Sequence, residues 1–425
     1  MRNFILLFLM FQMSIFGQGY TSYFTGNTTN ITTTTTAGTC LMGGRTENDN
    51  AMKWLLQKAN GGDVIVLRCS GTNGYNNYLY TTLGIPVNSV ETLLISSVAG
   101  ATNPYVLDKI ANAEMIWFAG GDQSLYVNYF KDNALEDLLN NHINVKHAPI
   151  GGTSAGMAIL CGNYFGALNG SVTSAQALTN PYDALVTLGN NDFLNVPFLQ
   201  NTTTDTHFDF YGRNGRLTSF LARKATDTGF RSFGIAANEY VAICIDESGK
   251  ASVFGDYPNY QEFAFFAQAN CQSSFLPEVC QANSQLTWNR SGEAIKIYKV
   301  PGTQTGTNFF QLSDWNSGSG GTWENWIANN GMYASNAGSQ PNCNLSASDF
   351  DNNKINIFPV PFSEKIEIEG FENATIKIFD TNSQLVFENF FKDKIAVDSS
   401  KFSTGLYLMT INQNGKIITK KIIKN

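Results

Sequence analysis

The residue types and spacing best suited to chemistry lie at Gly152-Thr153-Ser154-Ala155-Gly156. A strand-like apolar run ends at Ile150 just before them, and residues 157–160 read as the start of a helix. Gly-x-Ser-x-Gly between a strand and a helix is typical of a nucleophile elbow, whose tight turn admits small flanking residues and lifts the serine hydroxyl clear of the sheet. The Ala155 N–H would then be free to stabilise an oxyanion. Ser154 is therefore the candidate nucleophile, with a helix-capping serine as the alternative.

A serine is a poor nucleophile until a base takes its proton, and the chain offers three histidines. His142 falls on the polar end of a predicted helix. His147 comes at the start of the strand that leads to Ser154, at the end far from the turn. His207 lies in an Asp-Thr-His-Phe-Asp segment just before a turn-rich stretch. Elimination favours His207 as the base, and a surface-loop histidine remains the alternative.

The third member of such a site is a carboxylate that orients the imidazole. Glu239 stands between two apolar runs, residues 233–237 and 241–245. A glutamate in apolar surroundings is costly unless it has a partner, which favours a site role. Asp205 and Asp209 are nearer His207 in sequence and remain competitors.

Two further segments could contact a substrate. Ligands of open α/β sheets bind at the carboxyl ends of strands, and the strand-like residues 115–118 lead directly into Gly120-Gly-Asp-Gln123. There Gly121 could supply a second oxyanion N–H, and Asp122 and Gln123 could bind substrate. Half of the eight arginines fall at residues 213–231. Of these, Arg213 and Arg216 could hold an acidic side chain or a terminal carboxylate by bidentate contacts, or could be solvated or helix-capping residues.

The elements around these residues alternate between strands and helices. Buried strands are predicted at residues 64–67, 92–95, 115–118 and 147–150, with helices at 48–58, 103–111 and 123–140 between them. A helix near 216–224 and a strand near 233–245 follow. This alternation predicts an α/β fold with a parallel sheet and helices on both faces.

The remaining segments have other compositions. Residues 1–17 have the layout of a secretory signal peptide, and the Thr/Asn-rich residues 18–37 read as a flexible lead-in. The predicted α/β domain spans 38–345, with a core at 38–255 and a loop-rich tail at 256–345, whose Trp315, Trp323 and Trp326 we expect to be packing residues. Among the seven cysteines, a Cys271–Cys280 disulfide is the pairing we expect.

Beyond a linker at 346–353, residues 354–425 show short alternating strands separated by Asn, Asp, Gly and Ser, which predicts a small antiparallel β-sandwich. The opening Phe358-Pro-Val-Pro, the Ser403-Thr-Gly-Leu-Tyr-Leu stretch and the lysine-ending last strand resemble the type A C-terminal sorting domain of type IX secretion in Bacteroidetes. The resemblance implies that type IX secretion machinery recognises the module. It also implies a secreted or surface-attached protein that has passed through the periplasm.

The chemical motifs, taken as a set, resemble the cyanophycinase and peptidase E family of serine peptidases. The matching strings are Gly120–Gln123, Gly152–Gly156, Asp-x-His207-Phe and Gly234-Ile-x-x-x-Glu239, in order and rough spacing over residues 38–255. The resemblance implies a class I glutamine-amidotransferase-like fold and a Ser154–His207–Glu239 triad, with Gln123 in the substrate pocket. The family's strict cyanophycinases have glutamine where Thr206 stands and arginine where Tyr211 stands, so cyanophycin itself is in doubt as the substrate.

Charge and composition exclude other classes of function. The net charge is −7 with a pI near 5.1, and no basic stripe with interleaved aromatics occurs, which argues against nucleic acid as a partner. No other segment reaches transmembrane length, so no membrane span is expected in the mature chain. The absence of a CxxC or His/Cys cluster argues against a metal site, and serine chemistry requires no cofactor.

The sequence thus predicts an exported serine hydrolase that cleaves peptide or isopeptide bonds near aspartate through an acyl-enzyme. The alternative is a surface-displayed binding or structural protein on a catalytically retired peptidase fold, for which the altered motif at Thr206 and Tyr211 and the Trp-rich tail are the support. A true glutamine amidotransferase would require a cysteine in place of Ser154.

Overall fold

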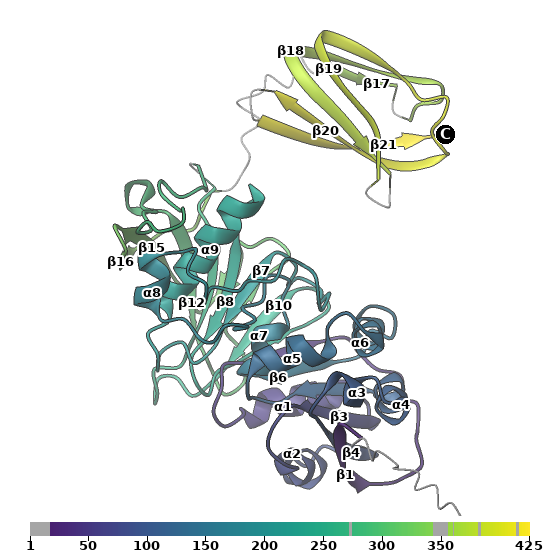
Figure 1. The fold of residues 1–425 in the computed structure, drawn as a ribbon, viewed down its shortest axis with the longest axis vertical. Helices are drawn as coiled ribbons and strands as arrows, with labels where there is room; N and C mark the ends of the chain where they lie inside the picture. The colour runs from purple at the N-terminus through teal and green to yellow at the C-terminus, as the bar shows by residue number, and fades with distance from the viewer. Residues whose placement is uncertain (1–17, 272–273, 343–355, 360, 381–383, 414–415) are drawn as a thin grey trace, which may run out of the picture. The chain divides into compact units, whose positions relative to one another are not determined.

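A computed structural model of the chain describes residues 18–271, 274–342, 356–359, 361–380, 384–413 and 416–425 (Figure 1). The predicted signal peptide and the predicted linker at 346–353 lie outside the described residues. The chain divides into two units, Met1–Asn342 and Cys343–Asn425, each of which is described by itself below.

The first unit is built on a ten-stranded sheet whose middle five strands, β4 to β2 in spatial order, are parallel to one another. The flanking strands are antiparallel. In spatial order the strands are β1 (Tyr20–Gly26), β4 (Ser89–Ile95), β3 (Asp63–Arg68), β5 (Met115–Phe118), β6 (Ile150–Thr153), β2 (Thr39–Met42), β9 (Ala242–Ile245), β10 (Lys250–Phe254), β13 (Phe309–Gln311) and β14 (Gly318–Ser319).

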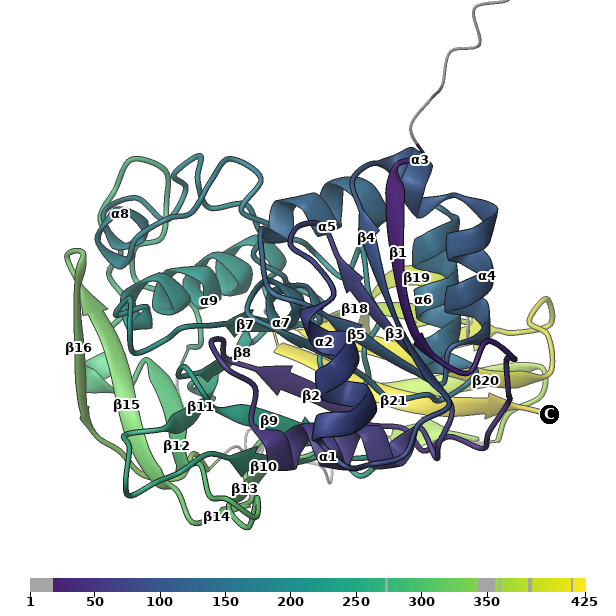
Figure 2. The same ribbon diagram turned by 90° about the horizontal axis from the view of Figure 1, so that it is seen from below.

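Helices cover both faces of this sheet, because the side chains of each central strand alternate between two apolar cores. In β3, Val64 and Val66 face a core shared with α1 (Asp49–Lys58). Ile65 and Leu67 face the other core, with α4 (Pro104–Asn112), α5 (Gln123–Phe130), α6 (Ala134–Asn144) and α7 (Ala155–Ile159). Figure 2 shows α1 on one side of the sheet and α4, α5 and α6 on the other. The predicted α/β fold is confirmed.

Two element boundaries differ from the prediction, and backbone geometry explains both. The helix predicted at 123–140 is two helices, since Asp132 has φ 59° and the Asn133 side chain caps α6 by accepting from Leu135 N–H at 3.0 Å. The strand predicted at 147–150 begins instead at Ile150, because His147 has φ 50°, outside the β region.

A second, six-stranded sheet corrects the prediction of a loop-rich tail at 256–345. Most of its strands come from that segment, in the spatial order β16 (Met332–Ala337), β15 (Thr322–Asn329), β12 (Ile295–Pro301), β11 (Phe263–Ala269), β8 (Phe233–Ala237) and β7 (Thr202–Asp205). Helix α9 (Asn214–Thr228) packs Leu217 and Leu221 into the same core as the buried Trp326, which stacks on Phe208. Trp315 and Trp323 also pack against aromatic side chains, as expected.

The lead-in predicted to be flexible contains a strand. Tyr20 to Gly26 form β1, which pairs antiparallel with β4 along its whole length. Beyond it, the backbone N–H groups of Ile31 and Thr36 donate to Asp63 and Lys58, at 3.1 and 3.0 Å. Tyr, Thr and Phe have good β propensity, and a strand at the edge of a sheet needs little burial. The low apolar content of the segment therefore did not predict this strand.

The predicted Cys271–Cys280 disulfide is wrong. Cys271 is disulfide-bonded, but Cys280 is a free, partly buried thiol. Cys40, Cys161 and Cys244 are buried free thiols, and Cys69 is a partly buried one.

The second unit is antiparallel throughout its described strands, which are β17 (Asn356–Phe358), β18 (Lys365–Phe379), β19 (Leu385–Asp398), β20 (Gly405–Gln413) and β21 (Lys416–Lys424). The long β18 pairs with β17 in its first half and with β20 in its second, so it belongs to both halves of the module. Between the two halves of the module lies a separate apolar core that includes Phe362, Ile376 and Met409. The predicted small β-sandwich is confirmed. In neither unit does the described chain include a helix long and apolar enough to span a membrane.

Candidate active site

Ser154 lies on a sharp turn between β6 and α7, with φ 52° and ψ −112°. The glycines of the motif are required by close approach: a Cβ on Gly152 would lie 2.6 Å from the Gly156 carbonyl carbon, and one on Gly156 would lie 2.2 Å from the Phe118 oxygen. The Ser154 N–H donates to Met42 O at 3.0 Å, which ties the turn to β2. This is the geometry of a nucleophile elbow, in which backbone strain serves to present the hydroxyl.

The Ser154 hydroxyl and two further side chains form a continuous hydrogen-bonded relay. Ser154 donates to His207 Nε2 at 2.8 Å, and His207 Nδ1–H donates to Glu239 Oε1 at 2.6 Å. The His207 and Glu239 side chains are 19% and 8% exposed. The three residues singled out in the sequence, 53 and 32 positions apart, are thus brought together with an acceptor nitrogen facing the hydroxyl.

His207 is held beside the elbow by the backbone around it. It follows the end of β7 with φ 47°, and its N–H donates to Gly43 O at 2.8 Å. Gly44, with φ 127°, leaves room for the imidazole, since a Cβ there would lie 2.3 Å from the ring carbon Cε1. The loop after β2 therefore forms one wall of the imidazole site.

Glu239 lies where the chain passes from one sheet to the other. The single strand predicted at 233–245 is in fact two strands, β8 in the six-stranded sheet and β9 in the ten-stranded sheet, and the turn between them includes Tyr240 with φ 66°. The Glu239 backbone N–H donates to Asp209 Oδ1 at 3.0 Å. Burial raises the pKa of Glu239, but hydrogen bonds from His207 and Arg45 outweigh it, so the pKa is below its ordinary value. The carboxylate is ionised at neutral pH.

The competing residues have other partners. Asp205 accepts both Arg216 Nε and Arg216 Nη2, at 2.8 and 2.5 Å, in a buried pair. His142 is fully buried, with its Nε2 3.1 Å from Pro149 O. Asp209 orients the Glu239 backbone, as described above. Of the histidines and carboxylates considered in the sequence, His207 hydrogen-bonds to Ser154 and Glu239 hydrogen-bonds to His207.

The two candidate substrate arginines differ in availability. Arg216 is 4% exposed, and besides Asp205 its guanidinium donates to Val172 O and Ser171 Oγ. It therefore holds the end of β7 in place and does not face a substrate. The Arg213 side chain is 15% exposed and donates to Thr206 O at 2.6 Å. Burial lowers its pKa to about 10, which leaves it charged at neutral pH.

The segment after β5 borders Ser154, as expected from its position at a strand end. A Cβ on Gly120 would lie 3.5 Å from Ser154 Cβ, and Gly121 follows it with φ 152°. Asp122 caps α5 by accepting Ser124 N–H at 2.9 Å, and Gln123 Nε2 lies 3.5 Å from Phe165 O. Ala155, as the first residue of α7, has an N–H without an intrahelical acceptor.

Arg45 is a site residue that the sequence reading did not single out. Its Nε lies 3.0 Å from Glu239 Oε1, the oxygen that also accepts from His207. One sequence feature could have indicated it: Gly43-Gly44-Arg45 comes immediately after a buried strand, and so lies at the same edge of the sheet as Ser154.

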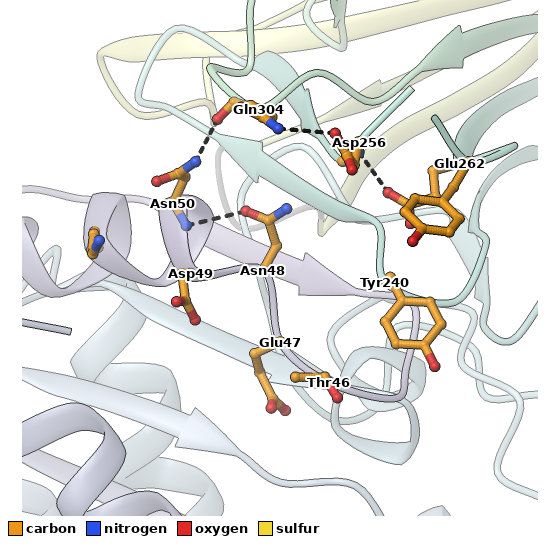
Figure 3. Close-up of a pocket in the computed structure, with 12 residues that line it drawn as sticks. Thr46, Glu47, Asn48, Asp49, Asn50, Tyr240, Asp256, Glu262 and Gln304 are labelled. Atoms are coloured by element: carbon orange, nitrogen blue, oxygen red, sulfur yellow. Dashed lines mark hydrogen bonds between the residues drawn. The ribbon is translucent and has the colours of Figure 1, made fainter. Parts of the chain in front are cut away.

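A hollow of about 730 Å³ opens beside Arg45 and Glu239, since the next residues, Thr46 and Tyr240, line it (Figure 3). Gln304 closes one side by accepting from Asn50 at 2.8 Å and donating to Asp256 at 2.9 Å. Ser154, His207 and Glu239 themselves are not among the residues that line the hollow. Among the described residues, no group of three or more His, Cys, Asp or Glu could hold a metal ion.

A strained serine elbow at the carboxyl end of a parallel sheet, with an aligned imidazole and carboxylate, defines the class of site found in serine hydrolases. Comparison with known proteins adds the following.

Residues 356–425 match the family described as the secretion system C-terminal sorting domain. This confirms the predicted sorting domain and marks the chain as a protein exported by type IX secretion, to the cell surface or beyond. No curated protein matches the chain in sequence.

Two solved structures are similar to part of the chain. A peptidase from an acI-B1 Actinobacterium shares 15% identity over 54% of this chain and 93% of its own, with a TM-score of 0.39. A candidate peptidase E protein from Listeria monocytogenes EGD-e shares 16% identity over 50% of this chain and 95% of its own, with a TM-score of 0.31.

Proposed function

We propose that this exported protein is a serine hydrolase that cleaves peptide or isopeptide bonds near aspartate, using Ser154, His207 and Glu239 as its triad. The observation that carries the proposal is the relay from Ser154 Oγ to His207 Nε2 and from His207 Nδ1 to Glu239, at 2.8 and 2.6 Å. Both distances are within the reach that proton transfer requires.

In the proposed reaction, Ser154 Oγ attacks the carbonyl carbon while its proton passes to His207 Nε2. The backbone N–H groups of Ala155 and Gly121 receive the oxyanion. His207 then returns the proton to the leaving amine, the C–N bond breaks, and an acyl-enzyme remains on Ser154. Water, deprotonated by His207, attacks the ester and releases the acid. Throughout, Glu239 holds the imidazole in the Nδ1–H tautomer and stabilises its charged form.

The structure constrains the identity of the substrate less than it constrains the reaction. Gln123 and Arg213 are the expected residues with side chains near the site that remain partly accessible. Arg213 keeps a positive charge for an acidic group, which supports a preference for aspartyl substrates. Tyr211 stands where the strict cyanophycinases have an arginine, and Arg216 is turned inward to Asp205, so the arginine pattern of those enzymes is incomplete and short aspartyl peptides are better supported than cyanophycin.

The experiment is a hydrolysis screen of the purified chain against α-aspartyl dipeptides, β-Asp-Arg and cyanophycin. Ser154→Ala is the test variant and Ser248→Ala, a serine in the turn after β9, is the matched control. Ser154→Ala should abolish release of product while Ser248→Ala retains it. Equal activity in the two variants on any substrate that the wild type cleaves would exclude the proposed nucleophile.

A further inference from the structure

Arg45 stands in a strained conformation next to the triad. It follows Gly43 and Gly44 with φ 67°, a backbone conformation that costs free energy for any residue with a side chain. Its side chain is 49% exposed, yet it is held on both sides: Nε lies 3.0 Å from Glu239 Oε1, and the guanidinium lies 5.2 Å from the centre of the Phe210 ring. Phe210 is itself 59% exposed.

The contact does little for the stability of the loop. An ion pair with a half-exposed guanidinium contributes little to folding. The loop is already joined to the strand crossover by backbone hydrogen bonds, from Tyr240 N–H to Gly44 O at 3.0 Å and from Gly43 N–H to Val241 O at 2.9 Å. The stability of the loop therefore does not explain why the Arg45 side chain contacts Glu239.

The oxygen that Arg45 contacts is the one that His207 uses. Glu239 Oε1 accepts from His207 Nδ1 at 2.6 Å and from Arg45 Nε at 3.0 Å. The other charged or titratable groups that face this pair are an arginine, a carboxylate and two phenols (Arg213, Asp209, Tyr211 and Tyr240). Arg45 is the cation in direct contact, so it withdraws part of the negative charge that would otherwise favour a protonated imidazole.

We infer that Arg45 is a positioning residue that orients Glu239 and reduces the negative charge that this carboxylate presents to His207. This inference rests on the proposed function and deepens it. In this proposal, the lowest pH at which the reaction proceeds depends on Arg45, through the Glu239 Oε1 atom that contacts both Arg45 and His207.

The test is the pH dependence of the rate at which a fluorophosphonate probe labels Ser154 in the full chain, for Arg45→Met, Arg45→Lys and the wild type. Arg290→Met, which removes the same charge at a pair with Glu278 on a separate part of the chain, is the control. Arg45→Met should move the acid limb to higher pH by ~0.5–1 unit, the effect of one charge over ~6 Å at an effective dielectric constant of ~40–80. Arg45→Lys should move the limb back toward its wild-type position because it keeps the charge.

The outcomes separate the two proposals. A wild-type chain that the probe does not label would remove the proposed function, and this inference with it. A labelled wild type, together with an Arg45→Met limb that coincides with that of Arg290→Met, would leave the proposed function intact and overturn the role of Arg45. A lower rate at every pH without a shifted limb is what a merely structural residue would give, and it counts against the inference.

Discussion

Replacing Gly44 by alanine should disable the site while leaving the fold in place. The new Cβ would lie 2.3 Å from His207 Cε1, whereas ordinary van der Waals contact starts near 3.4 Å, so the ring must move by about 1.1 Å. A displacement of this size breaks the 2.8 Å contact between His207 Nε2 and Ser154. Since a misplacement of ~1 Å can cost ~100-fold in rate, we expect fluorophosphonate labelling to slow by about that factor.

The matched control is Gly170→Ala. Gly170 has φ 100°, comparable with φ 127° at Gly44, but a Cβ there meets nothing closer than 3.8 Å among the described residues. Both substitutions carry a backbone cost of ~1–3 kcal/mol, which urea unfolding measures. We expect similar losses of stability in both variants and slow labelling in Gly44→Ala alone. Equal labelling rates in the two variants would refute the placement of the imidazole against this loop.

Two further predictions concern buried ionisable groups. Asp205→Asn should reduce the free energy of unfolding in urea by ~3–5 kcal/mol, because it leaves the buried Arg216 charge without its partner. Asp227→Asn, at an exposed pair, should cost less than ~1 kcal/mol, and equal losses would contradict the account. Burial lowers the pKa of His142 to about 4, so between pH ~6.5 and 4 the unfolded chain binds a proton that the folded chain does not. Stability should therefore fall by ~3 kcal/mol as the pH drops through that window. His142→Leu should flatten the curve, and parallel curves would exclude the effect.

The three residues of the proposed triad could be singled out from the sequence because each carries a local constraint. A Cβ on either elbow glycine would lie 2.6 or 2.2 Å from a backbone atom, which excludes any residue with a side chain. His207 was left after elimination, but the reason for setting His142 aside was wrong: the sequence placed it on a polar helix end, whereas it is a fully buried residue. Glu239 was singled out by its apolar surroundings, and its partners His207 and Arg45 explain how a carboxylate is tolerated there.

What the sequence did not reveal depends on contacts between distant segments. The apolar runs at 233–237 and 241–245 are separated by only three residues, so periodicity did not show that β8 and β9 belong to different sheets. The strands at 256–345 are short and rich in polar and aromatic residues, a pattern that loops share. Disulfide pairing is not encoded by spacing, which is why Cys280 was assigned wrongly. Arg45 carries no local signal of its contact with Glu239, 194 positions later in the chain.

The most direct test of the central claim is to identify the residue that a fluorophosphonate modifies in the purified chain. Mass spectrometry of the digested adduct should place a single phosphonyl group on Ser154. Labelling should disappear in Ser154→Ala and in His207→Ala. A wild-type protein that stays unlabelled, or one labelled at another residue and still labelled in Ser154→Ala, would contradict the account and favour a non-catalytic binding or structural protein on this fold.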